Sequence, residues 1–237
     1  MTRAGPVIRC DPASLPDIAA TWITGAIDVV TRLQGRCTIA LAGGATPRPI
    51  YERMATAPLA GRVAWDRVAV YFGDERRVPP DHPDSNYRMA YESLLRHVAI
   101  PIASVHRIEG ERADPDAATR DYERLLPASL DVLLLGMGAD GHTASLFPHS
   151  PALAEGTRRV LPVDRPAPSP GRITISPRVI ELAHTILVVV AGAEKAAAVA
   201  RALEGPYAPD ALPVQLALRG TWLIDEDAAR DLRGIVP

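Results

Sequence analysis

The sequence predicts an α/β fold in which a doubly wound, largely parallel sheet carries helices on both faces. Apolar strand-like runs alternate with amphipathic helical stretches, which is typical of such sheets. Residues 132–135 are four consecutive large apolar residues bounded by glycine, as in a central strand covered on both faces. Several of these runs end in loops rich in glycine or charge. Because ligands bind at the carboxyl ends of strands in open sheets, these loops predict a binding crevice.

The predicted elements follow one another in a regular order. A helix over residues 15–33 precedes a strand over 37–42, a helix over 47–55 precedes a strand over 67–72, and a helix over 86–95 follows a polar loop. A helix over 115–126 leads into a strand over 130–135. After an irregular, proline-rich section come a strand over 185–190 and a helix over 193–203. The segment RPAPSPG, residues 165–171, is expected to be a surface loop, because strand and helix signals resume directly after it.

Composition narrows the class of protein. The 237 residues, 47% of them hydrophobic, are enough for one large domain over residues 1–237. No apolar stretch approaches the length of a membrane span and the first residues lack a secretion signal, so we expect a cytoplasmic protein. Cys10 and Cys37 offer neither a disulfide framework nor metal spacing, and Cys37 is expected in the core. A net charge of -2 without basic runs argues against nucleic acid as the partner and favours a small molecule.

The first loop of interest, LAGGATPRP, has the composition of a phosphate cradle. Gly43 and Gly44 end a strand, Thr46 can cap the following helix, and Pro47 takes its first position. Free N–H groups at a helix amino terminus bind anions, and Arg48 adds positive charge. The alternative is a plain strand-to-helix turn. The segment is not a Walker loop, because GxxxxGK is absent.

The second loop places the charged residues 74–77 (DERR) directly after an apolar strand and Gly73. Their side chains would point into the crevice, although two charges of each sign could also form a solvated ion-pair cluster. Asp84 or Ser85 is expected to cap the next helix.

The third loop follows the strand that ends at Leu135 and contains Asp140 and His142 among three glycines. This position makes His142 a candidate catalytic base, although glycine-rich turns close many strands and most histidines have no chemical role. Ser145 lies in a helix-like TASLF run, and the absence of a GxSxG motif disfavours a covalent route through it. The other histidines, His149 included, show no paired ligand spacing and are expected in loops or on the surface.

The fourth loop contains Lys195, the only lysine among 26 basic residues. A cation in the first turn of a helix opposes the helix dipole, which suggests an anionic ligand beside it, unless a single lysine has remained by chance.

Together these loops resemble the 6-phosphogluconolactonase family, within the wider group of sugar-phosphate isomerase-like folds that includes glucosamine-6-phosphate deaminase. The resemblance covers nearly the whole chain and lies in LAGGATPRPIYERMA, VYFGDERRVPPDHPDSNYRMA, LLLGMGADGHTASLFP, and RITIS with VVVAGAEKAAAV. It implies an α/β sandwich and hydrolysis of 6-phospho-D-glucono-1,5-lactone to 6-phosphogluconate in the cytosolic pentose phosphate pathway. It also implies that no metal or other cofactor is required.

The resemblance also implies roles for individual residues. The family's catalytic histidine falls on His142, the arginine of its GDER segment on Arg76, and its acidic positions on Asp74 and Asp140. The phosphate-binding positions would be Gly43, Gly44, Thr46, Arg48, Arg172 and Lys195. Ala45 stands where the family often has serine, so one hydroxyl contact to phosphate would be missing.

These residues suggest a simple mechanism. His142 would take a proton from the attacking water and return it to the ring oxygen, and Arg76 would stabilise the oxyanion. Asp74 and Asp140 would orient His142 or hold sugar hydroxyls, and the sequence does not show which of the two residues has which role. The sequence leaves three points open. It does not show whether Arg77 or His149 contacts substrate, or whether the loop over 78–85 closes. It also does not show whether the protein is a monomer or a small homo-oligomer.

The sequence argues against two other functions. An amino-sugar phosphate deaminase or isomerase on the same fold needs an extra carboxylate near the histidine, and TASLFP contains none. A sugar-phosphate sensor would need a DNA-binding module, for which residues 1–36 are too short and insufficiently basic.

Overall fold

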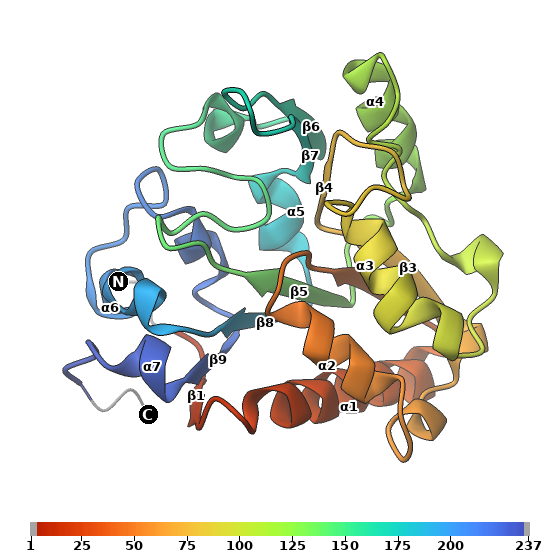
Figure 1. Cartoon of the computed structure of the whole chain (residues 1–237), viewed down its shortest axis with the longest axis horizontal. Helices are drawn as coiled ribbons and strands as arrows, with labels where there is room; N and C mark the ends of the chain where they lie inside the picture. Colours follow the sequence, from red (N-terminus) through yellow and green to blue (C-terminus); the bar gives the residue numbers. More distant parts are fainter. Residues whose placement is uncertain (1–3, 235–237) are drawn as a thin grey trace.

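The computed structural model describes residues 4–234, which form two sheets surrounded by helices (Figure 1). The larger sheet has six parallel strands in the order β1-β9-β8-β5-β2-β3, and the smaller has three antiparallel strands in the order β4-β7-β6. The strands are β1 (Val7–Cys10), β2 (Cys37–Leu41), β3 (Val68–Phe72), β4 (Asp74–Arg76), β5 (Val132–Gly136), β6 (Val160–Val163), β7 (Arg172–Ile175), β8 (Thr185–Val190) and β9 (Thr221–Asp225). The α-helices are α1 (Leu15–Gln34), α2 (Pro47–Met54), α3 (Asn86–Ser93), α4 (Pro115–Leu125), α5 (Pro177–Leu182), α6 (Ala196–Glu204) and α7 (Glu226–Ala229).

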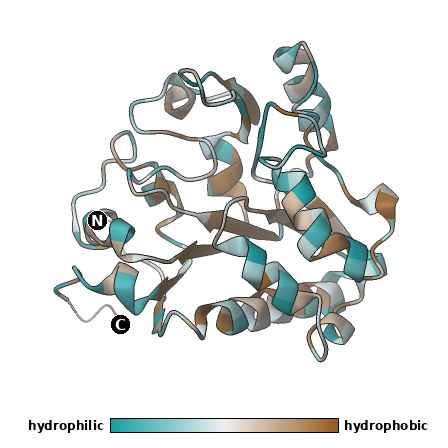
Figure 2. Ribbon diagram, viewed as in Figure 1, coloured by the Kyte–Doolittle hydropathy of each residue, from teal (hydrophilic) through white to brown (hydrophobic). Residues whose placement is uncertain are grey.

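The larger sheet confirms the predicted fold class. Strand β5 lies between β8 and β2, and its first four residues are buried, as the apolar run predicted. As drawn in Figure 1, α1 and α2 lie below this sheet, whereas α5 and the smaller sheet lie above it. Figure 2 shows the central strands as hydrophobic and the helices as mixed, which is the patterning of a sheet covered on both faces. Cys37 is fully buried in β2, as predicted.

The smaller sheet was not predicted. The proline-rich section contains β6 and β7, and the charged residues 74–76 form β4, which pairs with β7, rather than a loop. Strand β1 at one edge of the larger sheet and its neighbour β9 were also not predicted. The predicted helix over 193–203 begins with a 3-10 turn, η6 (Ala193–Lys195), before α6. Short strands of three to five residues carry too little periodicity to be distinguished from loops.

A single residue joins the two sheets. Strand β3 ends at Phe72 and β4 begins at Asp74, so only Gly73 separates them. The N–H of Gly73 donates to the C=O of Leu41 in the larger sheet (3.0 Å), and its C=O accepts from the N–H of Ile175 in the smaller sheet (2.9 Å).

Between residues 4 and 234, every helix is too short or too polar to traverse a lipid bilayer.

Candidate active site

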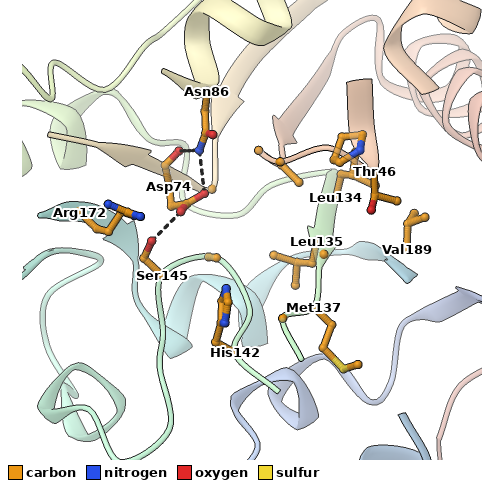
Figure 3. Close-up of a pocket in the computed structure, with 18 of the residues that line it drawn as sticks. Thr46, Asp74, Asn86, Leu134, Leu135, Met137, His142, Ser145, Arg172 and Val189 are labelled. Atoms are coloured by element: carbon orange, nitrogen blue, oxygen red, sulfur yellow. Dashed lines mark hydrogen bonds between the residues drawn. The ribbon is translucent and has the colours of Figure 1, made fainter. Parts of the chain in front are cut away.

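A pocket of about 400 Å³ opens where β2, β3, β5 and β8 end, at the carboxyl edge of the larger sheet. Four cationic side chains and one carboxylate are among its lining residues: Arg76, Arg165, Arg172, Lys195 and Asp74. This excess of positive charge, in a chain whose net charge is -2, suits an anionic ligand. Figure 3 shows that the side chains come from well-separated segments, with Arg172 and Thr46 on opposite sides and His142 between them.

The imidazole of His142 is paired with the carboxylate of Asp140. Their Nδ1 and Oδ1 atoms are 2.6 Å apart, and the backbone N–H of His142 donates to the same oxygen at 3.1 Å. A Cβ on Gly138 would lie 2.1 Å from His142 Nδ1, so only glycine leaves room for this pair. Burial alone would raise the pKa of Asp140, but the hydrogen bonds from His142 outweigh it and hold that pKa below its usual range. An ionised Asp140 therefore accepts the Nδ1 proton and leaves Nε2 available as a base.

Asp74 makes a different set of contacts. Its Oδ2 accepts a hydrogen bond from Ser145 Oγ (2.6 Å) and its Oδ1 accepts one from Asn86 Nδ2 (3.1 Å), as the dashed lines in Figure 3 show. The two carboxylates therefore have different partners: Asp140 is hydrogen-bonded to His142, and Asp74 is hydrogen-bonded to Ser145 and Asn86. Ser145 is not paired with His142, so the serine–histidine pair of a covalent route is not formed.

The segment that contains Ser145 is a turn and not the helix-like run expected. The N–H of Leu146 donates to the C=O of Thr143 (3.0 Å), and Ala144 has a φ of 48°. Positive φ is unfavourable for a residue with a Cβ, and backbone strain of this kind clusters at functional sites. Ala144 lines the pocket beside His142.

Glu75 has a structural role. Its carboxylate is buried and accepts hydrogen bonds from the N–H groups of Asn86 and Tyr87 at the start of α3 (2.7 and 2.8 Å) and from Ser85 Oγ (3.0 Å). Burial raises the pKa of Glu75, and these donors oppose the rise. Ser85 itself caps α3 through the N–H of Arg88, as predicted. The charged segment is therefore not a solvated ion-pair cluster.

Arg76 and Arg172 are direct neighbours across the β4–β7 ladder. Arg76 Nη1 donates to the C=O of Asp84 (2.5 Å), while its Nε is buried and has no hydrogen-bond partner among residues 4–234. Arg172 donates to the C=O groups of Pro170 and Gly171. Burial lowers the pKa of Arg172, and the positive charge of Arg76 adds to this effect. Two adjacent guanidinium groups that form no salt bridge within the described chain favour a bound anion between them.

Arg165 also lines the pocket, together with Arg76 and Arg172. The segment around it is exposed, which agrees with the predicted surface loop. Its guanidinium carbon lies 3.9 Å from the centre of the Phe147 ring, and that ring lies 4.7 Å from the imidazole of His142. Arg77 does not line the pocket. It holds the base of the Arg165 loop through its N–H to the C=O of Gly171 (2.8 Å) and through an ion pair with Asp164 (3.4 Å).

The glycine turn lines the opposite side of the pocket. Gly44 has a φ of 105°, and Thr46 occupies the N-cap position of α2 without using its hydroxyl as a cap. Pro47 and Pro49 have no backbone N–H. The backbone N–H groups that are free to donate at the start of α2 are therefore those of the glycine turn and of Arg48. Lys195 reaches the pocket from η6. The side chain of Arg48 is exposed and does not line the pocket, contrary to its predicted place at the phosphate.

Among residues 4–234, no three side chains of His, Cys, Asp or Glu come together in a way that could hold a metal ion.

Comparison with known proteins decides the family. A model described as glucosamine-6-phosphate isomerases/6-phosphogluconolactonase matches residues 10–224. The chain belongs to this family. A 6-phosphogluconolactonase from Synechocystis sp. is 39% identical to it over an aligned length of 232 residues, and the alignment covers 91% of this chain and 92% of that protein.

Solved structures share the fold of this chain. The 6-phosphogluconolactonase from Trypanosoma cruzi superposes with a TM-score of 0.85, at 27% identity, over 99% of both chains. A monomeric glucosamine-6-phosphate deaminase gives a TM-score of 0.82 at 23% identity, over 95% of this chain and 99% of that one. That likeness shows a shared fold. The predicted family resemblance and fold class are both confirmed.

The family's motif segments all reach the pocket, but several residues of the site were not found from the sequence. The sequence predicts Asn86 only as the start of a helix. In the structure its amide occupies the space that a Cβ on Gly43 would need, since that Cβ would lie 1.9 Å from Asn86 Oδ1. Arg165 was missed because strand β6, which leads to it, was not predicted. A strand assignment for VLPV would have placed Arg165 at a strand end.

Proposed function

We propose that this protein hydrolyses 6-phospho-D-glucono-1,5-lactone to 6-phosphogluconate. The observation that carries the proposal is the His142–Asp140 pair in a pocket lined by four cations. A base with a fixed tautomer suits the activation of water, and the cations suit a substrate with a phosphate group and a carbonyl that gains negative charge. The relatives named 6-phosphogluconolactonase, at 39% identity over most of both chains, support a lactonase of this kind.

In the proposed reaction, His142 Nε2 takes a proton from a water molecule as the water oxygen attacks the lactone carbonyl carbon. The carbonyl becomes a tetrahedral oxyanion, and Arg76 stabilises it. When the intermediate collapses, the bond from the carbonyl carbon to the ring oxygen breaks, and His142 returns the proton to that oxygen. A stabilising donor of this kind contributes about 3 to 4 kcal/mol in acyl transfer. The δ-lactone is already an activated ester, so such contributions suffice.

The phosphate is assigned to the glycine turn and Lys195. Gly43, Gly44 and Thr46 would donate through backbone N–H groups and the free Thr46 hydroxyl, and Lys195 would supply the charge. Arg172 was expected at the phosphate from the resemblance. It lies beside Arg76 and across the pocket from Thr46 (Figure 3), so we place it near the carbonyl instead.

Deamination of an amino-sugar phosphate is the alternative within the same fold. The segment TASLFP contains no carboxylate, which counts against a deaminase in the sequence. In three dimensions Asp74 contacts Ser145 of that segment and Asp140 contacts His142, so carboxylates do lie near the histidine and deamination is not excluded. The choice of lactonase instead depends on the relatives.

The test is the rate of disappearance of freshly generated lactone with wild type, His142→Ala and a blank without enzyme. Wild type should exceed the blank, and His142→Ala should fall close to it. A wild-type rate equal to the blank would refute the lactonase, and ammonia release from glucosamine 6-phosphate would then identify a deaminase.

A further inference from the structure

Two buried tyrosines, Tyr51 in α2 and Tyr122 in α4, make the same contact at two different strand ends. The hydroxyl of Tyr51 accepts a hydrogen bond from the N–H of Ala42 (3.0 Å) and donates one to its C=O (2.8 Å). The hydroxyl of Tyr122 accepts from the N–H of Phe72 (2.7 Å) and donates to its C=O (2.9 Å). Each hydroxyl therefore binds both polar groups of one backbone residue.

Both backbone residues lack a strand partner for these groups. Ala42 lies just past β2, beyond the last pair of the β2–β3 ladder, Leu41 with Phe72. Phe72 lies in β3, an edge strand of the sheet. Among residues 4–234 its outer side carries only an isolated bridge between Val70 and Val105, which does not reach Phe72. Buried N–H and C=O groups require partners, and a phenol that keeps its proton can serve one of each. Burial raises the pKa of both tyrosines, which keeps them protonated.

The two positions are the last residues before the two functional segments. Ala42 directly precedes Gly43 and Gly44. Tyr51 therefore holds the first end of the glycine turn through Ala42, and the Asn86 amide packs against Gly43. Phe72 precedes Gly73 and β4, so Tyr122 fixes the point from which Asp74 and Arg76 extend.

We propose that Tyr51 and Tyr122 are positioning residues for the reaction, Tyr51 for the phosphate-binding turn and Tyr122 for the strand that carries Asp74 and Arg76. The proposal rests on the proposed function for its kinetic part. Neither hydroxyl reaches the substrate, because both are consumed by backbone bonds and both side chains are buried. Their effects should therefore separate according to which wall of the pocket each one holds.

The experiment compares Tyr51→Phe and Tyr122→Phe, which delete one oxygen each and leave the rings in the core. For Tyr51→Phe we expect KM for the lactone to rise about tenfold with kcat within about threefold of wild type. For Tyr122→Phe we expect kcat to fall about tenfold with a smaller change in KM. Binding of inorganic phosphate, measured by calorimetry, should weaken about tenfold in Tyr51→Phe and stay unchanged in Tyr122→Phe.

A control variant shows whether a loss of stability alone explains the kinetic changes in the two tyrosine variants. Ile27→Ala in α1 removes a fully buried apolar side chain that does not line the pocket, so it lowers stability without deleting a hydrogen bond at either strand end. Its kcat, KM and phosphate affinity, measured well below its unfolding temperature, should equal those of wild type. If the two tyrosine variants behave like Ile27→Ala, or if both change the same parameter equally, the positioning roles are refuted. If wild type lacks lactonase activity but phosphate binding separates as described, the proposed function fails and the role of Tyr51 stands.

Discussion

Asp140 and His142 are two residues apart in the chain, and their side chains meet at 2.6 Å across the space left by Gly138. The pair is thus built within one short loop and does not depend on the packing of distant elements. In the proposed mechanism, this contact keeps the proton of His142 on Nδ1.

Replacing Asp140 with Asn should lower kcat about 100-fold, because the neutral amide no longer fixes the tautomer or stabilises the imidazolium that forms. Steady-state kinetics with subtraction of spontaneous hydrolysis measures this. A kcat within a factor of three of wild type would show that Asp140 does not serve the base.

The same residue should affect stability in a pH-dependent way. The pKa of Asp140 is lowered in the folded protein, so its ionised form stabilises the fold above its usual titration range. This contribution is lost as the pH falls through the lowered value. Denaturant unfolding of wild type and Asp140→Asn should therefore differ at neutral pH and converge in strong acid; a difference that persists there would contradict the assignment.

Ser145→Ala distinguishes direct attack by water from a covalent route. We expect kcat to fall by about tenfold or less, since the hydroxyl only holds Asp74, whereas loss of a nucleophile costs several orders of magnitude. Stability should fall by about 1 to 3 kcal/mol, because one oxygen of a buried carboxylate loses its donor. A trapped covalent adduct on Ser145, detected by mass spectrometry, would overturn the direct mechanism.

Lys195→Ala should raise KM by about 10- to 100-fold and change kcat less, because the charge acts on a phosphate that does not react. Lys195→Arg should recover part of the affinity, since it restores charge without the compact shape of an ammonium. An unchanged KM in Lys195→Ala would remove this residue from the phosphate site.

Arg165→Ala should also raise KM, by about tenfold, because a guanidinium stacked on Phe147 keeps its N–H groups available for an anion. The matched control is Arg178→Ala, which removes an exposed charge in α5 that does not line the pocket. Equal kinetics for the two variants would show that Arg165 acts only through net charge.

The sequence predicted the parts of the fold with strong periodicity and the parts of the site that lie in one segment. The four predicted strands and the helix over 15–33 were found because each contains a run or a stripe of apolar residues that is buried. His142 and Asp140 were found because they share a loop. Asn86, Arg165, Tyr51 and Tyr122 act through partners 9 to 50 residues away, or through a sheet of three short strands. A pattern read along one chain carries no signal for such contacts.

The hydrogen bonds of Gly73 have a consequence for the motion of the protein. Its N–H belongs to one sheet and its C=O to the other, so the two sheets cannot slide past each other at this point without breaking one of the two bonds. His142 follows a strand of the first sheet, and Arg76 and Arg172 belong to the second. The separation between base and guanidinium groups is therefore set when the chain folds, and the pocket presents nearly the same charge arrangement to each substrate molecule that enters.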